Sequence, residues 1–156
     1  MQNKYKLPKS TYQATLWVIR GQEERERKYR QDKDEILNSG GASYIKRYNS
    51  LLKSDEYIYL PKSYSSQSAV EIKALALLNL EKQIETKHMY AVQQALDEAV
   101  AGTKEPEKIK SALMNNISNR NGYPFRNLGC INISEKTFYN IKHKLIYLVA
   151  KKINLI

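Results

Sequence analysis

Residues 134–150 read SEKTFYNIKHKLIYLVA, which is the clearest helical pattern in the chain. Its apolar side chains fall within an arc of about 100° when plotted on a helix; they are Phe138, Ile141, Leu145, Leu148 and Val149. Ser134 is of a type that caps a helix N-terminus, since its hydroxyl can accept a bond from a free amide. The other side of the helix is polar and basic: Lys136, Asn140, His143, Lys144, Tyr147 and Lys151. We therefore predict an amphipathic helix with one buried and one cationic face.

The positive charge of the chain gathers around this helix. The 156 residues include 26 Lys or Arg and 16 Asp or Glu, which gives a net charge of +10. Residues 107–156 carry nine basic and two acidic groups, residues 1–20 carry four basic groups and no acid, and residues 21–106 are nearly neutral. This asymmetry favours a polyanionic partner, although a lysine-rich surface that only keeps the chain in solution has the same composition.

A basic helix that also carries an amide side chain has the chemistry of a DNA reader. Lys and Arg neutralise phosphates, and Asn offers the donor and acceptor that match an adenine edge. The N-terminal part of such a helix enters the major groove, so the base-edge candidates begin at Glu135. Phosphate contacts are expected from Arg126, Lys136, Lys142, Lys144, Lys151 and Lys152. The predicted DNA-binding residues are Arg126, Ser134, Lys136, Thr137, Tyr139, Asn140, His143, Lys144 and Lys151. A solvated amphipathic helix has the same periodicity.

Residues 133–150 resemble the C-terminal signature of phage late-gene transcriptional activators of the RinA/ArpU/LtrC-like group. The segment WVIR at 17–20, followed by a charged helix, is similar to the N-terminal part of such proteins. The resemblance implies a helix-turn-helix like region 4 of sigma factors, and control of packaging and lysis operons in Gram-positive bacteria. It implies that the recognition helix carries Ser134, Lys136, Thr137, Tyr139, Asn140 and Lys144. Residues 120–132 depart from the pattern because Gly and Pro interrupt them, so the supporting helix is either 107–118 or a single turn.

The N-terminal third reads as short helices. Ser10 and Gln13 have capping-box spacing, and the helix that they open has an apolar face made of Tyr12, Leu16, Trp17 and Ile19. Residues 22–37 form a mostly charged and solvated helix that ends before Gly40. We expect a second, shorter helix over 42–53, and over 55–66 a loop or at most a short extended piece.

Residues 67–101 contain neither Gly nor Pro and carry a long apolar stripe from Val70 to Ala99. They predict one helix of about 50 Å, or two helices with a break near 86–89. The stripe exposes more apolar surface than one short helix pair can cover, which favours a homodimer. Pro106 opens the next helix, which runs to about Ser118 and buries Ile109, Ala112, Leu113 and Ile117. The connector 119–130 has at most one turn.

We therefore expect an all-α fold, a helical bundle with a long central helix and a C-terminal helix-turn-helix-like DNA-binding module. The expected parts are residues 1–66, a packing or dimerisation helix within 67–104, and the DNA-binding module 105–156. A single cysteine and two separated histidines, His88 and His143, speak against a disulfide framework, a metal site and a cofactor. Neither a membrane span nor a signal peptide is visible. The sequence contains no phosphate-binding loop and no nucleophile constellation, so we do not expect an enzyme.

The sequence thus predicts a cytoplasmic, sequence-specific activator in a bacterial host, with double-stranded DNA and host RNA polymerase as partners. The main alternative is a DNA-packaging or structural component of a phage, like a small terminase, that binds DNA through its basic C-terminus without sequence choice. A second alternative is an adaptor that binds proteins through the 67–101 helix.

Overall fold

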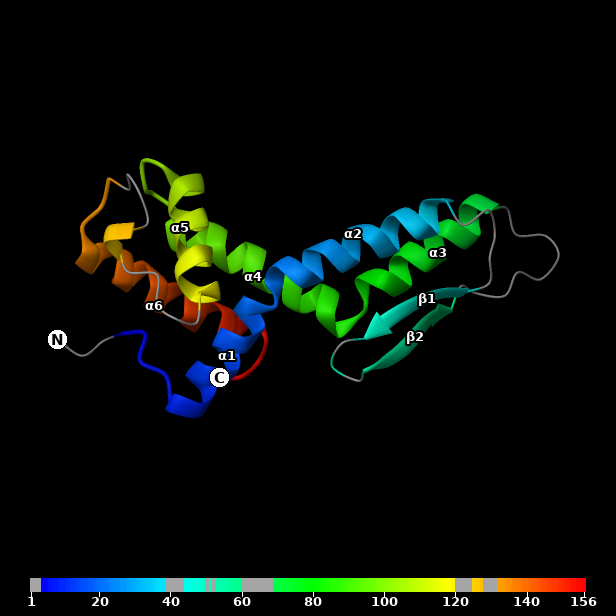
Figure 1. Ribbon diagram of the computed structural model, residues 1–156, viewed down its shortest axis with the longest axis horizontal. Coiled ribbons are helices and arrows are strands. Elements are labelled where there is room, and N and C mark those ends of the chain that lie inside the picture. Colours follow the sequence, from blue (N-terminus) through cyan, green and yellow to red (C-terminus); the bar gives the residue numbers. More distant parts are fainter. Residues whose placement is uncertain are drawn as a thin grey trace. The chain divides into compact units, whose positions relative to one another are not determined.

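The computed structural model describes residues 4–38, 44–49, 51, 53–59, 69–119, 125–127 and 132–156. These ranges contain six α-helices and one two-stranded hairpin, so the expected all-α class is confirmed at this level (Figure 1). The elements are α1 (Lys9–Arg20), α2 (Gln22–Asn38), β1 (Tyr44–Asn49), β2 (Ser54–Tyr59), α3 (Ala69–Glu81), α4 (Ile84–Val100), α5 (Pro106–Ser118), the 3₁₀ turn η1 (Phe125–Asn127) and α6 (Glu135–Lys152). Within the described ranges, no helix has the length and apolar character needed to cross a bilayer.

The chain forms two compact units. Unit 1 joins both ends of the sequence and comprises residues 1–23 and 88–156. Unit 2 is the middle of the sequence, residues 24–87. The helices α2 and α4 each contribute residues to both units.

Unit 1 has the larger apolar core. α1 packs against α5 and α6, and the C-terminal part of α4 adds Val92, Ala95 and Leu96 to the same cluster (Figure 1). The largest fully buried side chains of this core are Ile19, Val92, Val100, Ile109, Leu113, Ile117, Phe138, Leu145, Ile146 and Val149. Apolar burial of this extent is the dominant favourable term in folding, so this core is what holds α6 in place.

Local signals set the ends of the helices in unit 1. Pro106 lies in the first turn of α5, as predicted, and the buried face of α5 contains the four expected residues. Gly102 has φ +82° just after the last turn of α4, a conformation that glycine adopts without strain. The prediction that Ser10 caps α1 is wrong, because Pro8 holds the N-cap position and Ser10 lies inside the first turn. Trp17, expected on the buried face, is 64% exposed.

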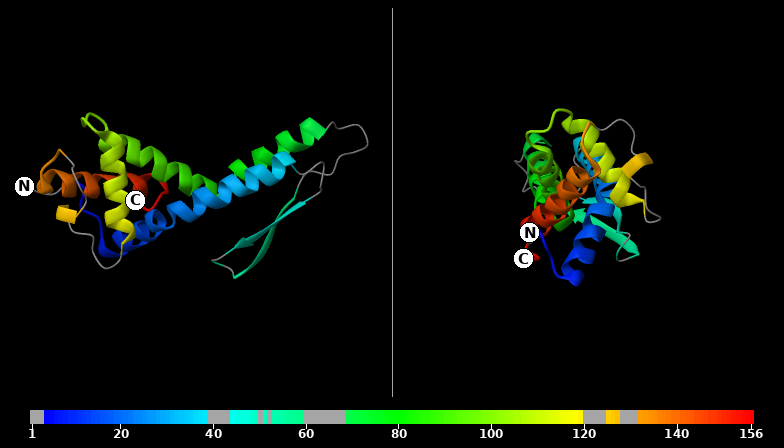
Figure 2. Two further views of the ribbon diagram at one scale, coloured as in Figure 1. Left: turned by 45° about the horizontal axis from the view of Figure 1, so that its top comes forward. Right: turned by 90° about the vertical axis from the view of Figure 1, so that its left-hand side faces the viewer.

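Unit 2 consists of two helices and the hairpin. α2 and α3 lie side by side in both views of Figure 2, and Ile36, Ala76 and Leu80 form the small core that they share. Two polar contacts tie the same pair of helices: Lys73 Nζ donates to the carbonyl of Leu37 at 2.6 Å, and the Tyr29 hydroxyl donates to the Glu81 carboxylate. β2 lies against α3.

The helix expected over 42–53 is wrong. Residues 44–49 form β1, which pairs antiparallel with β2 so that Tyr44 is opposite Tyr59 and Asn49 is opposite Ser54. Tyr and Ile favour strands, and a strand needs a partner, which here lies about ten residues further along the chain. For residues 55–66 we expected a loop or at most a short extended piece. The extended alternative is correct for residues 55–59, which lie in β2, whereas residues 60–66 lie outside the described ones.

Two helices, and not one, occupy the long apolar run. The break between α3 and α4 falls at Lys82 and Gln83, slightly before the alternative position considered at 86–89. The amide of Gln83 bonds to the carbonyl of Leu80 at 3.2 Å, an i→i−3 bond that closes α3 with a tighter turn. Val70, expected on the apolar stripe, is 76% exposed.

Candidate nucleic-acid interface

α6 presents the two faces that the sequence predicts. Phe138, Ile141, Leu145 and Val149 are buried in the core of unit 1, and Leu148 packs against it. The Ser134 hydroxyl accepts a hydrogen bond from the Thr137 amide at 3.2 Å, which confirms the predicted cap. The same hydroxyl lies 2.8 Å from Thr137 Oγ1. This cap sets the start of α6 at Glu135.

The first turns of α6 carry a group of exposed polar side chains. Lys136, Thr137 and Asn140 are exposed, as is Arg126 of η1. The ring of Phe125 lies 5.5 Å from the ring of Phe138, centroid to centroid, so η1 packs on this end of α6. Arg126 is thereby brought to the same end of the helix as Lys136 and Asn140. We call the three helix residues Lys136, Thr137 and Asn140 the N-terminal polar patch of α6. Arg126 lies at the same end of the helix but belongs to η1, which packs on the Phe138 side.

Tyr139 and Lys142 are partly buried. The Tyr139 ring meets the Phe138 ring edge-on at 5.5 Å, and Lys142 Nζ lies 5.8 Å from the centroid of the Tyr139 ring. Partial burial lowers the pKa of Lys142, and the charge of Arg20 lowers it further. The Arg20 guanidinium is itself held by the carbonyl of Ile117, to which its Nε donates at 2.9 Å. Lys142 therefore belongs to the packing of unit 1 as well as to its charge.

Replacing Lys142 with methionine is expected to stabilise the protein at pH 7. A lysine whose folded pKa is below its unfolded pKa destabilises the folded state at pH values where it is protonated, and this cost disappears as pH rises toward the unfolded value. Methionine keeps the apolar stem and removes the charge, so we expect a melting temperature about 1–3 °C higher at pH 7 and a smaller difference near pH 10. Thermal melts at both pH values, with the exposed Lys151→Met as control, measure this. A lower melting temperature for Lys142→Met at pH 7 contradicts it.

Two of the lysines expected to meet phosphates contact the end of α4. Lys144 Nζ donates to the carbonyl of Glu98 at 3.1 Å, and Lys152 Nζ lies 2.7 Å from Glu98 Oε1. Lys110 of α5 forms an ion pair with Asp97, one residue earlier, at 2.5 Å. Cations are favourable near the C-terminus of a helix. The three lysines therefore join α5 and α6 to the last turn of α4, and only a fraction of the charge near α6 faces solvent unpaired.

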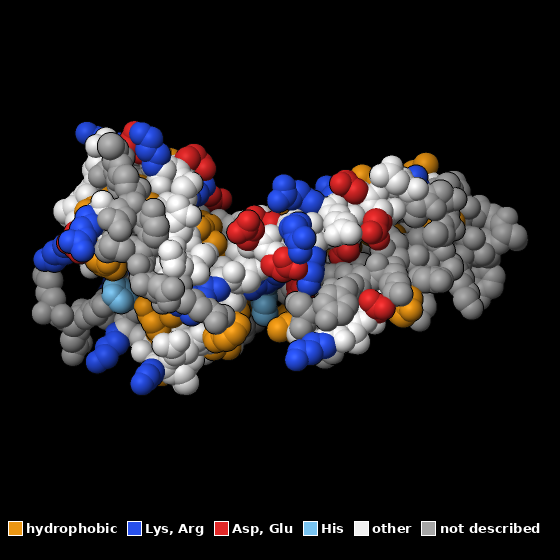
Figure 3. All heavy atoms as spheres, in the orientation of Figure 1, with side chains coloured by type: hydrophobic (Ala, Val, Ile, Leu, Met, Phe, Trp, Pro, Cys, Tyr) orange, Lys and Arg blue, Asp and Glu red, His pale blue; other side chains and the backbone are white. Residues whose placement is uncertain are grey.

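The N-terminal segment lies on the polar face of α6. The ring of Tyr5 lies 5.5 Å from the ring of Tyr147, and the ring of Tyr12 lies 6.4 Å from the ring of His143. His143 is therefore partly covered by α1, while Lys4, Lys6 and Lys9 of this segment are exposed. In Figure 3, Lys and Arg side chains lie along the left and lower edges of unit 1. The sequence shows the charge of residues 1–20 but not its place beside α6, since core and ring contacts between distant residues bring the two segments together.

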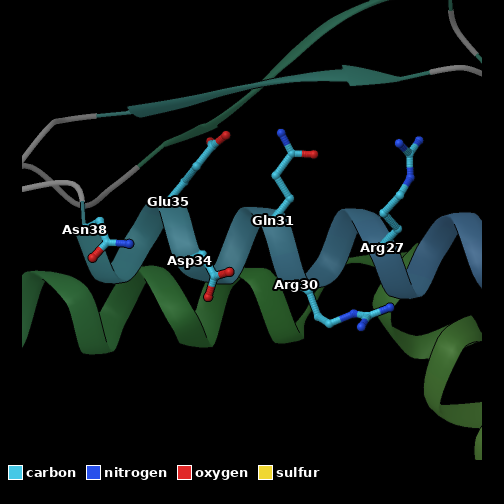
Figure 4. Close-up of a pocket in the computed structure, with 6 residues that line it drawn as sticks. All are labelled: Arg27, Arg30, Gln31, Asp34, Glu35 and Asn38. Atoms are coloured by element: carbon cyan, nitrogen blue, oxygen red, sulfur yellow. The ribbon is translucent and has the colours of Figure 1, made fainter.

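A shallow hollow of about 650 Å³ lies along α2 in unit 2. Six side chains line it, and all of them come from this one helix (Figure 4): Arg27, Arg30, Gln31, Asp34, Glu35 and Asn38. All six are exposed, and Arg27 is already paired with Glu24 at 2.7 Å. Mixed charges on a single helix are typical of a solvated surface, and we place the candidate site on α6 instead.

The nine predicted DNA-binding residues thus divide into groups. Lys136, Thr137 and Asn140 form the exposed patch, Ser134 caps the helix beside them, Arg126 is exposed on the neighbouring η1, and Lys151 is exposed near the other end of α6. Tyr139, His143 and Lys144 are partly buried against neighbouring elements. Comparisons with protein-family models, curated proteins and solved structures find no match for this chain. Its function has to be argued from these side chains.

Proposed function

We propose that this chain is a sequence-specific DNA-binding transcriptional activator of phage or phage-satellite late genes, those for packaging and lysis. The observation that carries the proposal is the N-terminal polar patch of α6. Lys136, Thr137 and Asn140 are exposed on consecutive turns, while Phe138 between them is fully buried. A helix anchored in this way can present an amide and a cation to base edges without losing its core contacts. The resemblance of residues 133–150 to phage late-gene activators supports the same function.

In this proposal α6 is the reading helix of a helix-turn-helix-like module. A compact helix-turn-helix joins its helices by a turn of about 3–4 residues, whereas residues 119–134 separate α5 from α6. Phe125 places η1 against Phe138, so η1 is next to the reading end of α6 and α5 supports the core behind it. The module therefore differs from the compact motif in its connector.

Affinity would come from cations that form no ion pair with another described residue. Among those exposed in unit 1, near α6 or on the N-terminal segment that packs on it, we assign five to phosphate contacts: Lys4, Lys6, Arg126, Lys136 and Lys151. Phosphate contacts of this kind position the protein and carry no sequence information. Activation would then require contact with host RNA polymerase in the bacterial cytoplasm.

If these five cations meet phosphates, log affinity should fall with log salt at a slope of about −4 to −5, close to 0.9 per contact. The slope is measured by fluorescence anisotropy on one duplex between about 50 and 200 mM salt. Lys104→Glu, a change at an exposed lysine beyond the end of α4, should leave the slope nearly unchanged. A slope near zero would mean that the basic surface makes no phosphate contacts and only keeps the chain in solution.

Selection of bound duplexes from a random library tests sequence choice. The activator proposal requires a recurrent sequence that binds at least about 1,000-fold more tightly than random DNA at one fixed salt concentration. A DNA-packaging component that only holds DNA would show the salt slope without a recurrent sequence, and this outcome would favour the packaging alternative. An adaptor that binds proteins alone would show neither.

A further inference from the structure

α3 is apolar on more than one side. Nine of its thirteen residues are apolar, yet among the side chains of this helix that the structure describes only Ala76 and Leu80 are fully buried. Leu78 is 55% exposed and Val70 is 76% exposed. A helix that is apolar all round is normally covered on all sides, so α3 presents a face that needs a partner.

One stripe of this face has heptad spacing. Glu71, Leu75, Leu78 and Lys82 follow one another at intervals of four, three and four residues, and on a helix they fall within about 60° of one another. The amide of Lys82 bonds to the carbonyl of Leu78 at 3.2 Å, so the helical path continues to the end of the stripe. Glu71, Leu78 and Lys82 are exposed, and Leu75 is partly exposed. The fully buried Ala76 and Leu80 lie on the opposite side of α3.

The charges and leucines of the stripe match those of a second, antiparallel copy of the same stripe. Its two ends carry opposite charges and its middle carries two leucines. When two copies of α3 run antiparallel about a two-fold axis, Glu71 of each copy faces Lys82 of the other, and Leu75 faces Leu78. In a parallel pair, like charges would face each other at both ends and oppose association.

We propose that the protein forms a homodimer through an antiparallel α3–α3 contact made by the Glu71–Leu75–Leu78–Lys82 stripe. A two-fold axis uses the same patch on both copies, which is the commonest arrangement of soluble dimers. Each copy buries two leucines, and the dimer contains two interchain ion pairs. This is a small interface, so we expect a weak, reversible dimer. The proposal does not depend on DNA binding.

Charge exchange tests the contact and its direction. Glu71→Lys or Lys82→Glu alone places two like-charged pairs across the interface, and we expect each to weaken dimerisation about tenfold. The double variant Glu71→Lys/Lys82→Glu restores opposite charges and should return the dissociation constant to within about threefold of wild type. Sedimentation velocity from about 5 to 500 μM measures these constants without DNA.

Two further variants complete the experiment. Lys104→Glu makes the same change of net charge at an exposed lysine outside α3, and we expect no change in dimerisation. Leu78→Asp should give a monomer, and an unchanged melting temperature at low concentration shows that unit 2 still folds. A wild-type monomer throughout the range overturns the proposal and leaves the face to another protein. Single variants that dimerise like wild type, or a double variant that stays weak, overturn it equally.

Discussion

Replacing Phe138 with alanine is expected to destabilise unit 1 by about 3–5 kcal/mol. Phe138 has no exposed surface and its ring lies 5.5 Å from the rings of both Phe125 and Tyr139. Removing the ring leaves a cavity between α6 and η1, and the core cannot close around it without moving both elements. Urea unfolding followed by circular dichroism measures the change as a lower midpoint.

Two controls separate packing from other effects of Phe138→Ala. Phe138→Leu keeps most of the volume and should cost about 1.5 kcal/mol or less. Leu155→Ala removes an exposed leucine beyond α6 and should change stability by about 0.5 kcal/mol at most. A cost below about 1 kcal/mol for Phe138→Ala would show that the core at the start of α6 is not closely packed. In that case the polar patch beside it would have no rigid support.

Asn140→Ala is expected to cost about 1–3 kcal/mol on the selected DNA sequence, which is about 5- to 150-fold in affinity, and little on random DNA. Asn140 is exposed on α6 and belongs to the N-terminal polar patch, one turn after Lys136. Loss of a bidentate contact to adenine removes discrimination at one base pair and leaves the phosphate contacts unchanged. Anisotropy titrations on both duplexes at one salt concentration measure the two costs.

Lys151→Ala provides the contrast. Lys151 is exposed near the other end of α6, and phosphates are the same on every sequence, so both duplexes should lose affinity by a similar factor. The salt slope should fall by about 1. Asn115→Ala, a matched change at an exposed asparagine of α5, should affect neither duplex. If Asn140→Ala and Lys151→Ala weaken both duplexes alike, α6 is not a sequence reader and the packaging alternative gains weight.

The helices of unit 1 could largely be predicted because their signals are local. Ser134 and its capping partner Thr137 lie within one turn. Pro106 favours the first turn of α5 because its ring fixes φ at a helical value. The buried face of α6 follows from a 3.6-residue period that any amphipathic helix must satisfy. The exposure of Lys136 and Asn140 follows from the same period, since they lie away from that face.

The tertiary structure alone decided the features that join distant residues. Residues 44–49 combine a helix-like spacing with strand-favouring Tyr and Ile, and their pairing with residues 54–59 makes them a strand. α3 ends at Glu81 without Gly or Pro nearby.

Contacts across the core also decided which charges remain available. The sequence alone gives no partner for Lys144 and Lys152. In the structure both contact Glu98, about fifty residues earlier: Lys144 its carbonyl and Lys152 its carboxylate. Tyr5 and Tyr12 bring a basic N-terminal segment to the face of α6 that carries Tyr147 and His143. Helical periodicity and capping residues can be recognised in the sequence because they involve residues within a few turns. Contacts between side chains of different helices depend on how the helices pack.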